Sequence, residues 1–368
     1  MQLDLNDPAG DIEMVENAVV VPPDPAGKTR HQRSGVLAPD GRFVENAISW
    51  DDSSHFVNAA PDMPQGELPV IPGSWMFGGI VYGHFGHFIV ESMARVWALA
   101  ELEGRIDGIL FTPKIVGERP NRALTVYADL MRGFGVEVPT QLIVSPTRVE
   151  RLYVPRQGFG TRDLITGSAK FRDWMTTRVG RDVPAEGAER IYISRSRLPP
   201  MRGGLIGESI IEDHLRAEGY EMFHPQLEPQ ARQIAQYKAA RDIISVDCSP
   251  LHLVGYVGDA GQRVAIVTRR SMSIAQNMVQ QLQSFTGAQA FEVNALVRDW
   301  VPGNSHRAGR SSFGEIDFPA TWAALKARGM IAAETPWPAL TDEQRAADLA
   351  RIEELHKMAF TPLDPVTG

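Results

Sequence analysis

The sequence has little cysteine, no long apolar run and no excess of positive charge. Cys248 is the single cysteine among 368 residues, so an intrachain disulfide is excluded. No apolar run approaches the roughly 20 residues of a transmembrane helix, and the first ten residues do not resemble a signal peptide. We therefore expect a cytoplasmic protein without a transmembrane segment. With 37 Lys and Arg against 45 Asp and Glu, it lacks the basic field that duplex nucleic acid demands, so no nucleic-acid partner is expected.

Several motifs that would identify a chemistry directly are also missing. No complete Gly-x-Gly-x-x-Gly follows a predicted strand, and neither a Gly-x-Ser-x-Gly elbow nor an Asp-x-Asp pair occurs. Carboxylate pairs of the last kind hold the metal ion that neutralises a diphosphate in metal-dependent sugar transferases. Their absence favours arginines and backbone dipoles for that task. We therefore expect no metal site and no cofactor.

What the sequence does contain is an alternation of strand and helix patterns, which predicts an α/β fold with parallel sheets and helices on their faces. Residues 1 to about 75 predict short strands and loops. Strands are predicted at 107–111, 141–145, 151–154, 190–194, 221–224, 242–246, 263–268 and 290–293, and helices at 88–103, 122–134, 164–179, 208–218, 229–240 and 273–285. The second half reads as a doubly wound unit.

The length predicts two domains, because 368 residues exceed one ordinary core. We expect an N-terminal α/β domain at 1–160 with an irregular, strand-rich start, a linker region at 161–188, and a second α/β domain at 189–298. A helical tail is expected at 299–368. In that tail, Thr341 to Gln344 forms a capping box that opens a helix running to about His356.

The first segment with candidate chemistry runs from Tyr82 to Arg95. His87, Glu91 and Arg95 are four residues apart and predict one polar stripe on an otherwise apolar helix. The helix dipole disfavours a charged imidazole in the first turn, so we expect a neutral His87 that takes a proton from a hydroxyl, oriented by Glu91. The alternatives are a structural His–Glu pair or a metal pair formed with His84.

The second segment is a strand end that carries arginines. The strand at 190–194 leads into a loop with Arg195 and Arg202, and Glu208 opens the next helix. Ligands of α/β sheets bind at such strand ends. Guanidinium groups and free amides at a helix start suit phosphate oxygens, and Glu208 is expected to orient an arginine. A solvated basic loop is the alternative.

The third segment, 245–252, also follows a predicted strand. Ser249 and His252 are candidates to hold a nucleotide there. Cys248 reads as a packed small hydrophobic residue rather than a nucleophile.

Together these segments resemble glycosyltransferase family 61, the DUF563 group, in its bacterial type. The family shares a His-Phe or His-Trp pair with a glutamate one turn later, as in His87-Phe88 and Glu91. It shares a Tyr-Ile-Ser-Arg strand end followed by an arginine and an acid, matched by 192–195, Arg202 and Glu208. Its Gly-Ser-Ala-Leu-His signature is similar to 248–252. The resemblance covers roughly residues 75 to 270.

The resemblance implies a GT-B-like architecture, in which two Rossmann-like domains face across a cleft, and inverting sugar transfer without an essential metal. A carbohydrate or glycan acceptor would be activated by His87, with Glu91 as its partner. The nucleotide-sugar donor, of a hexose or a pentose, would bind the C-terminal domain in polysaccharide biosynthesis. The residues expected to bind the donor are Arg195, Arg202, Glu208, Ser249 and His252.

This chain departs from the family pattern at three positions. The usual asparagine before the helix glutamate is Gly207, and Cys248 and Pro250 replace the glycine and alanine of the signature. These departures leave open a catalytically inactive subunit that binds nucleotide or carbohydrate. A pyruvyl-type transferase acting on polysaccharide is the other alternative. The sequence also leaves a homo-oligomer open.

Overall fold

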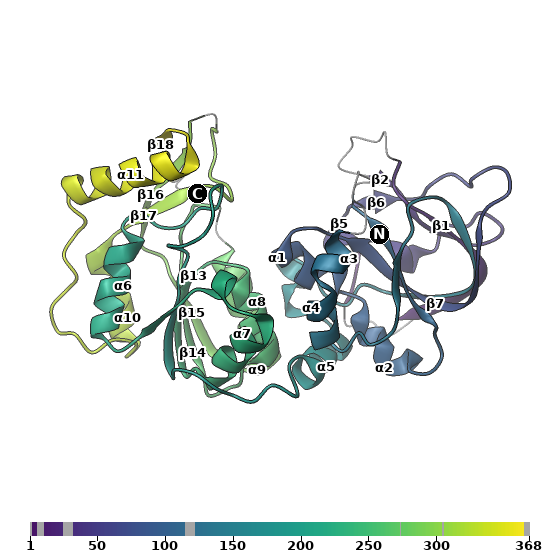
Figure 1. The fold of residues 1–368 in the computed structure, drawn as a ribbon, viewed down its shortest axis with the longest axis horizontal. Helices are drawn as coiled ribbons and strands as arrows, with labels where there is room; N and C mark the ends of the chain where they lie inside the picture. The colour runs from purple at the N-terminus through teal and green to yellow at the C-terminus, as the bar shows by residue number, and fades with distance from the viewer. Residues whose placement is uncertain are drawn as a thin grey trace. The chain divides into compact units, whose positions relative to one another are not determined.

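The computed structural model describes residues 2–5, 11–24, 32–114, 122–272, 274–303 and 305–363. The chain divides into two compact units, Met1–Arg181 and Asp182–Gly368, which we call the first and second units. Each unit combines helices with a sheet that contains parallel strands (Figure 1). The prediction of a mixed α/β protein is thereby confirmed.

A six-stranded sheet forms the centre of the first unit, in the order β3-β1-β10-β7-β8-β9. Its strands are β1 Ile12–Val21, β3 Gly35–Leu37, β7 Val70–Val81, β8 Gly108–Pro113, β9 Thr140–Leu142 and β10 Thr147–Pro155. The four strands β10, β7, β8 and β9 are parallel, whereas β1 and β3 pair antiparallel. A purely Rossmann-like sheet is therefore not what the first unit contains. β8 is buried along its whole length, as a central strand covered on both faces must be.

The remaining elements of the first unit are short. They are β2 Gln32–Arg33, η1 Glu45–Ala47, β4 Trp50–Asp52, β5 His55–Phe56, β6 Asn58–Ala59, α3 Arg122–Val126, α4 Ala128–Gly133, η4 Arg162–Thr166 and α5 Ala169–Arg178. The single helix predicted at 122–134 is thus two helices, which meet at Tyr127.

The helix predicted at 88–103 is also broken. The chain forms α1 Phe85–His87, a π-helical turn η2 Phe88–Ser92, a 3-10 turn η3 Val96–Ala98 and α2 Leu99–Leu102. Of the apolar residues whose spacing predicted this helix, Ile89, Met93, Val96 and Trp97 are buried, whereas Ala100 is exposed. Spacing does not distinguish an α-turn from a π-turn, and π-turns occur often at functional sites.

The second unit is built on a five-stranded, wholly parallel sheet in the order β12-β11-β13-β14-β15. Its strands are β11 Arg190–Ile193, β12 Glu221–Phe223, β13 Asp242–Val246, β14 Arg263–Val267 and β15 Gln289–Val293. The connecting helices are α6 Glu208–Ala217, α7 Gln230–Ala239, α8 Pro250–Val257 and α9 Ala275–Thr286, with η5 Pro225–Leu227 before α7. In Figure 1, α6 lies on one side of the sheet and α7, α8 and α9 on the other. The doubly wound prediction is confirmed for this unit.

The segment from 299 onward is not simply a helical tail. It contains α10 Phe318–Ala327 and α11 Asp342–His356, but also a three-stranded antiparallel sheet of β17 Phe313–Ile316, β16 Leu296–Pro302 and β18 Phe360–Leu363. The capping box at Thr341 is present as predicted, with Gln344 as its partner. Along the described ranges, no helix combines the length and the apolar character needed to cross a bilayer.

Candidate active site

The His87–Glu91 pair forms as its spacing predicted. His87 ends α1 and Glu91 lies in the π-turn that follows, and His87 Nδ1 is hydrogen-bonded to Glu91 Oε2. The imidazole is 54% exposed, whereas the carboxylate is only 10% exposed. A largely buried carboxylate thus orients an imidazole that solvent reaches.

The electrostatics of His87 differ from the expectation. Its hydrogen bond with Glu91 raises the pKa of His87, and the negative charges of Glu91 and Asp51 act in the same direction, whereas burial lowers it. The helix dipole is therefore not the main influence on this imidazole, because α1 has only three residues and the adjacent carboxylate acts in the opposite direction.

Two residues that the sequence reasoning did not assign to the site surround this pair. The Tyr82 ring stacks on the His87 ring with 5.4 Å between centroids, and the Lys114 ammonium lies 5.7 Å from the Tyr82 centroid. Burial and the nearby Glu91 raise the pKa of Tyr82, so its hydroxyl stays protonated. Lys114 directly follows β8 and reaches the pair through its contact with Tyr82. The two residues are far apart in the sequence, so local spacing does not reveal this contact.

His84 lies beside His87, with 5.6 Å between ring centroids. A metal site needs more ligands than these two histidines. In the part of the chain that the structure describes, no group of three or more His, Cys, Asp or Glu side chains could hold a metal ion.

Arg95 does not join the predicted polar stripe. Its side chain is 1% exposed and donates hydrogen bonds to three main-chain carbonyl oxygens, those of Pro155 at 3.0 Å, Asn46 at 3.1 Å and Ile48 at 2.6 Å. Burial lowers the pKa of Arg95 to about 10, which leaves the guanidinium charged at neutral pH. Arg95 therefore connects its segment to the main chain at residues 46, 48 and 155. Of the predicted polar stripe, only the His87–Glu91 pair remains.

In the second unit, Arg195 and Glu208 are brought together. Glu208 Oε1 accepts a hydrogen bond from the Arg195 main-chain N–H at 2.7 Å, and Arg195 Nε donates to the Gly203 carbonyl at 2.7 Å. Burial raises the pKa of Glu208. Glu208 therefore fixes the backbone of the arginine loop, and the guanidinium is held from the other side by Gly203.

The start of α6 is not the open phosphate site that the sequence suggested. The Gly207 N–H, which precedes the helix, donates to Asp348 Oδ2 at 2.7 Å, and the Leu205 N–H donates to Glu208 at 3.4 Å. Carboxylates of the protein itself thus occupy these amides. The amides of Leu205 and Gly207 are therefore not free to bind phosphate.

A strand of the C-terminal segment holds the arginine loop in place. The Gly203 N–H donates to the Arg310 carbonyl at 2.9 Å, and β17 exchanges hydrogen bonds with the loop through Gly314, which accepts from Ile206 at 2.8 Å. A β-carbon on Gly203 would lie 1.9 Å from the Ser312 carbonyl oxygen. This glycine is therefore required by the close approach of two backbones.

The other predicted donor residues lie in different surroundings. Arg202 is half-buried on the same loop as Arg195, and Ser249 is half-buried at the start of α8. His252 is 7% exposed, and its Nδ1 is 2.5 Å from Gln281 Oε1 on α9. That contact connects α8 with α9.

Two further arginines reach the same edge of the sheet and were missed by the sequence reasoning. The register pairs Ile193 with Ser245 and Val246 with Val267, so the ends of β11, β13 and β14 are level. Asp247 directly follows β13, Arg195 and Arg269 come two residues after the ends of β11 and β14, and Arg270 comes next. The strand-end argument that identified Arg195 would have found Arg269 if it had been applied to β14.

These side chains form one buried charged cluster. Asp247 is fully buried, and its Oδ1 lies 3.0 Å from Arg269 Nε, while Oδ2 lies 3.6 Å from Arg270 Nε. Burial lowers the pKa of Arg195 to about 10, and the positive charge of Arg269 adds to this effect. Arg195 is therefore still charged at neutral pH and lies within electrostatic reach of a second cation.

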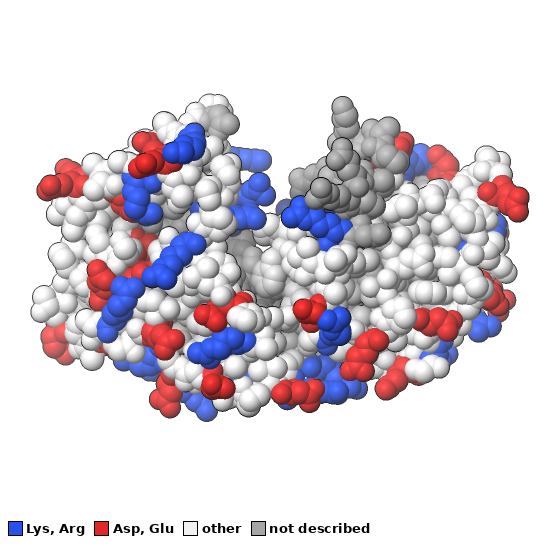
Figure 2. Space-filling view, in the orientation of Figure 1, with Lys and Arg blue, Asp and Glu red and all other residues white. Residues whose placement is uncertain are grey.

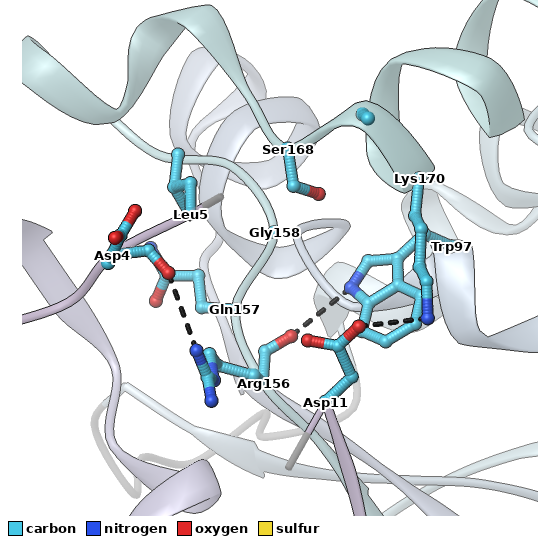
Figure 3. A pocket seen from close by; sticks show the side chains of 10 residues that line it. Asp4, Leu5, Asp11, Trp97, Arg156, Gln157, Gly158, Ser168 and Lys170 are labelled. Atoms are coloured by element: carbon cyan, nitrogen blue, oxygen red, sulfur yellow. Dashed lines mark hydrogen bonds and ion pairs between the residues drawn. The ribbon is translucent and has the colours of Figure 1, made fainter. Parts of the chain in front are cut away.

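A separate cavity of about 190 Å³ lies in the first unit, and it contains none of the predicted site residues (Figure 3). Around it, Trp97 Nε1 donates to the Arg156 carbonyl at 3.1 Å and Lys170 forms an ion pair with Asp11 at 2.8 Å. These polar groups bond to one another, so we assign the cavity no part in the site.

Charges on the visible face give no sign of a nucleic-acid surface. Lys and Arg are interspersed with Asp and Glu over both units, and no single-sign field covers either one on that face (Figure 2). A mixed surface of this kind is typical of proteins whose ligands bind at local sites.

No curated protein matches the chain. A family model described as Glycosyltransferase 61 matches residues 85–259. The match contains all the residues proposed for the site: His87, Glu91, Arg195, Arg202, Glu208, Ser249 and His252. Residues 85–259 therefore match the glycosyltransferase 61 family that the three motif segments indicated.

Proposed function

We propose that the protein transfers a sugar, with inversion and without a metal ion, from a nucleotide-sugar donor to a carbohydrate acceptor. The family match supports glycosyl transfer. The observation that carries the mechanism is the half-exposed His87 imidazole oriented by the buried Glu91 carboxylate. Such a pair is the usual arrangement of a general base and the group that orients it.

The hydrogen bond to Glu91 determines which nitrogen of His87 acts. With Nδ1–H donated to the carboxylate, Nε2 carries the lone pair when the ring is neutral. Above the raised pKa of His87, Nε2 accepts the proton of the acceptor hydroxyl, whose oxygen then attacks the anomeric carbon from the face opposite the leaving group. The transition state resembles an oxocarbenium ion. Glu91 stabilises the imidazolium that forms.

The departing nucleoside diphosphate needs positive charge. We assign this task to Arg195 and Arg202 of the second unit, since electrostatic stabilisation of the leaving group is usually the largest catalytic contribution. Ser249 and His252 would hold the nucleotide, and Glu208 would keep the arginine loop in shape. A GT-B-like organisation of an acceptor domain and a donor domain, and a cytoplasmic location, are parts of this proposal that rest on the sequence.

Two of the three departures from the family pattern fit the local backbone, which favours an active enzyme over an inactive binding subunit. Gly207 has a φ of 73°, in the left-handed region that asparagine also tolerates better than most residues. Pro250 occupies the first turn of α8, a favourable position for proline. Neither change requires a different loop.

The test compares His87→Ala and Glu91→Gln with the wild type and with His84→Ala, a matched control because His84 is an exposed histidine of the same loop. His87→Ala should bind a nucleotide sugar with normal affinity in calorimetry, while turnover falls about 10²–10⁴-fold. Glu91→Gln should lose less, because it keeps the shape and removes the charge.

Unchanged turnover in a folded His87→Ala variant would show that the base lies elsewhere. Saturable nucleotide binding without any turnover in the wild type would indicate an inactive binding subunit. A wild-type protein that ignores all nucleotide sugars would favour the pyruvyl-type alternative.

A further inference from the structure

Arg269 has hydrogen-bonding capacity that the protein itself does not use. Arg269 is only 4% exposed, and its Nη1 atom is buried and has no hydrogen-bond partner among the residues that the structure describes. Buried polar groups are nearly always paired, because leaving one unpaired costs about 1–3 kcal/mol and more for a charged group. A buried guanidinium nitrogen of this kind is therefore available to bond a group from outside the protein.

The carboxylates around Arg269 do not reach this nitrogen. Asp247 contacts the guanidinium through Nε, at 3.0 Å. Glu208 accepts the main-chain N–H of Arg195, and Asp299 accepts the main-chain N–H of Ser271 at 3.2 Å with both oxygens. These carboxylates fix the backbone around the cluster and leave Nη1 to an anion from outside.

Two positively charged residues, Arg195 and Arg269, lie at the same edge of the sheet of the second unit. Neighbouring strands lie about 4.8 Å apart, so the ends of β11 and β14, on either side of β13, are roughly 10 Å apart. Arginine side chains that extend from both ends can converge on one group above β13. Arg195 and Arg269 follow those two ends and are close enough to lower the proton affinity of Arg195.

We propose that Arg269, together with Arg195, binds a phosphoryl group of the donor diphosphate through its Nη1 atom, to which no described residue is hydrogen-bonded. Asp247 is the positioning residue that holds the Nε side of Arg269 and orients the fork. The planar guanidinium matches phosphoryl oxygens in geometry and charge. The inference rests on the proposed function, since it names a further ligand of the same donor.

The backbone of Arg269 is also fixed by a close contact with β17. A β-carbon on Gly314 of β17 would lie 2.1 Å from the Arg269 carbonyl oxygen, so the backbone of Arg269 is pressed against this glycine. A group that is to meet a ligand at a defined place benefits from such a rigid support.

The test uses inorganic pyrophosphate, which contains the phosphoryl groups without nucleotide or sugar. Calorimetric titration should show that Arg269→Met weakens pyrophosphate binding about 10- to 100-fold, the worth of one charge-assisted contact. Arg241→Met is the matched control, because Arg241 belongs to the same unit but forms a solvent-exposed ion pair with Asp259. It should bind as the wild type does.

Two further measurements guard against a variant that does not fold. Arg269→Lys keeps a positive charge beside Asp247 and loses the fork, and it should show the same weakening with a melting temperature close to that of the wild type. In the wild type itself, pyrophosphate at matched ionic strength should slow hydrogen exchange in residues 268–272.

Wild-type affinity in a folded Arg269→Met or Arg269→Lys variant would overturn the inference, as would a wild type that gains no protection from pyrophosphate. These outcomes leave the proposed function standing if the wild type still turns over a nucleotide sugar. Conversely, pyrophosphate binding that depends on Arg269, without any turnover of nucleotide sugars, would contradict the proposed function alone.

Discussion

Replacing Arg95 by methionine should destabilise the first unit strongly, although no ligand touches this residue in our proposal. The substitution keeps most of the apolar side-chain volume and removes three hydrogen bonds to buried carbonyl oxygens. Each charge-assisted bond is worth about 1.5–3 kcal/mol, so three sum to roughly 4.5–9 kcal/mol. Part of this loss is offset, because the variant no longer has to bury a charged guanidinium group. Because each carbonyl oxygen that loses its partner costs about 1–3 kcal/mol, we expect a net loss of roughly 3–5 kcal/mol.

Urea unfolding of the full chain, followed by tryptophan fluorescence, measures the effect. Arg148→Met is the control, because Arg148 also donates to a main-chain carbonyl, that of Asn17 at 3.1 Å, in an exposed position. It should change the free energy of unfolding by less than about 0.5 kcal/mol. An Arg95→Met variant within about 1 kcal/mol of the wild type would refute the reasoning.

Gly79 offers an independent check of the same contact. A β-carbon on Gly79 would lie 2.4 Å from Arg95 Nη1, and the residue has a φ of 91°, which favours glycine. Gly79→Ala should therefore also be destabilising. Because the two residues contact each other, the double variant with Arg95→Met should lose less than the sum of the single losses.

Further predictions concern the site. Since Glu91 raises the pKa of His87, the pair stabilises the fold below the unfolded pKa of about 6.5 and loses this contribution as the pH rises through the folded pKa. The stability difference between wild type and Glu91→Gln should therefore shrink with rising pH in denaturation experiments, and a difference that grows would contradict it. The ascending limb of the pH–rate profile should move to lower pH in the same variant. Arg195→Ala and Arg202→Ala should each weaken nucleoside diphosphate binding by about 1.5–3 kcal/mol in calorimetry, and unchanged affinity in both would mean a merely solvated loop. Turnover should persist in EDTA, and a loss restored by manganese or magnesium would exclude a metal-independent site.

The second unit could be predicted well because its central strands are short apolar runs with charged borders. The bounds of β13 agree with the predicted strand at both ends, and β14 begins at the predicted Arg263. Each buried parallel strand must be apolar on both faces, which gives an unambiguous pattern. The strands β16, β17 and β18 were missed. β16 and β18 are partly exposed, and β17 is buried but only four residues long and includes a glycine and a glutamate, so none of them gives a strong apolar pattern.

In the candidate site, contacts between residues close in the sequence could be predicted, whereas contacts between residues far apart could not. His87 and Glu91 are four residues apart, so their contact follows from helical geometry even though the turn is a π-turn. The partners of Arg95 are carbonyl groups 47 to 60 residues away, and no local pattern indicates them. Arg269 is different, since the strand-end rule sufficed and was not applied to β14.

The contact between the arginine loop and β17 should limit how the two segments change in sequence during evolution. The family match ends at residue 259, yet the backbone groups that shape the loop belong to Arg310 and Gly314. Because Gly203 has no room for a side chain beside Ser312, neither segment can drift freely in sequence without the other. In descendants of this gene, substitutions near 203 and near 312 should therefore appear as correlated pairs. Replacing the segment after residue 259 with that of a distant relative should impair donor binding, even when every residue of 85–259 is retained.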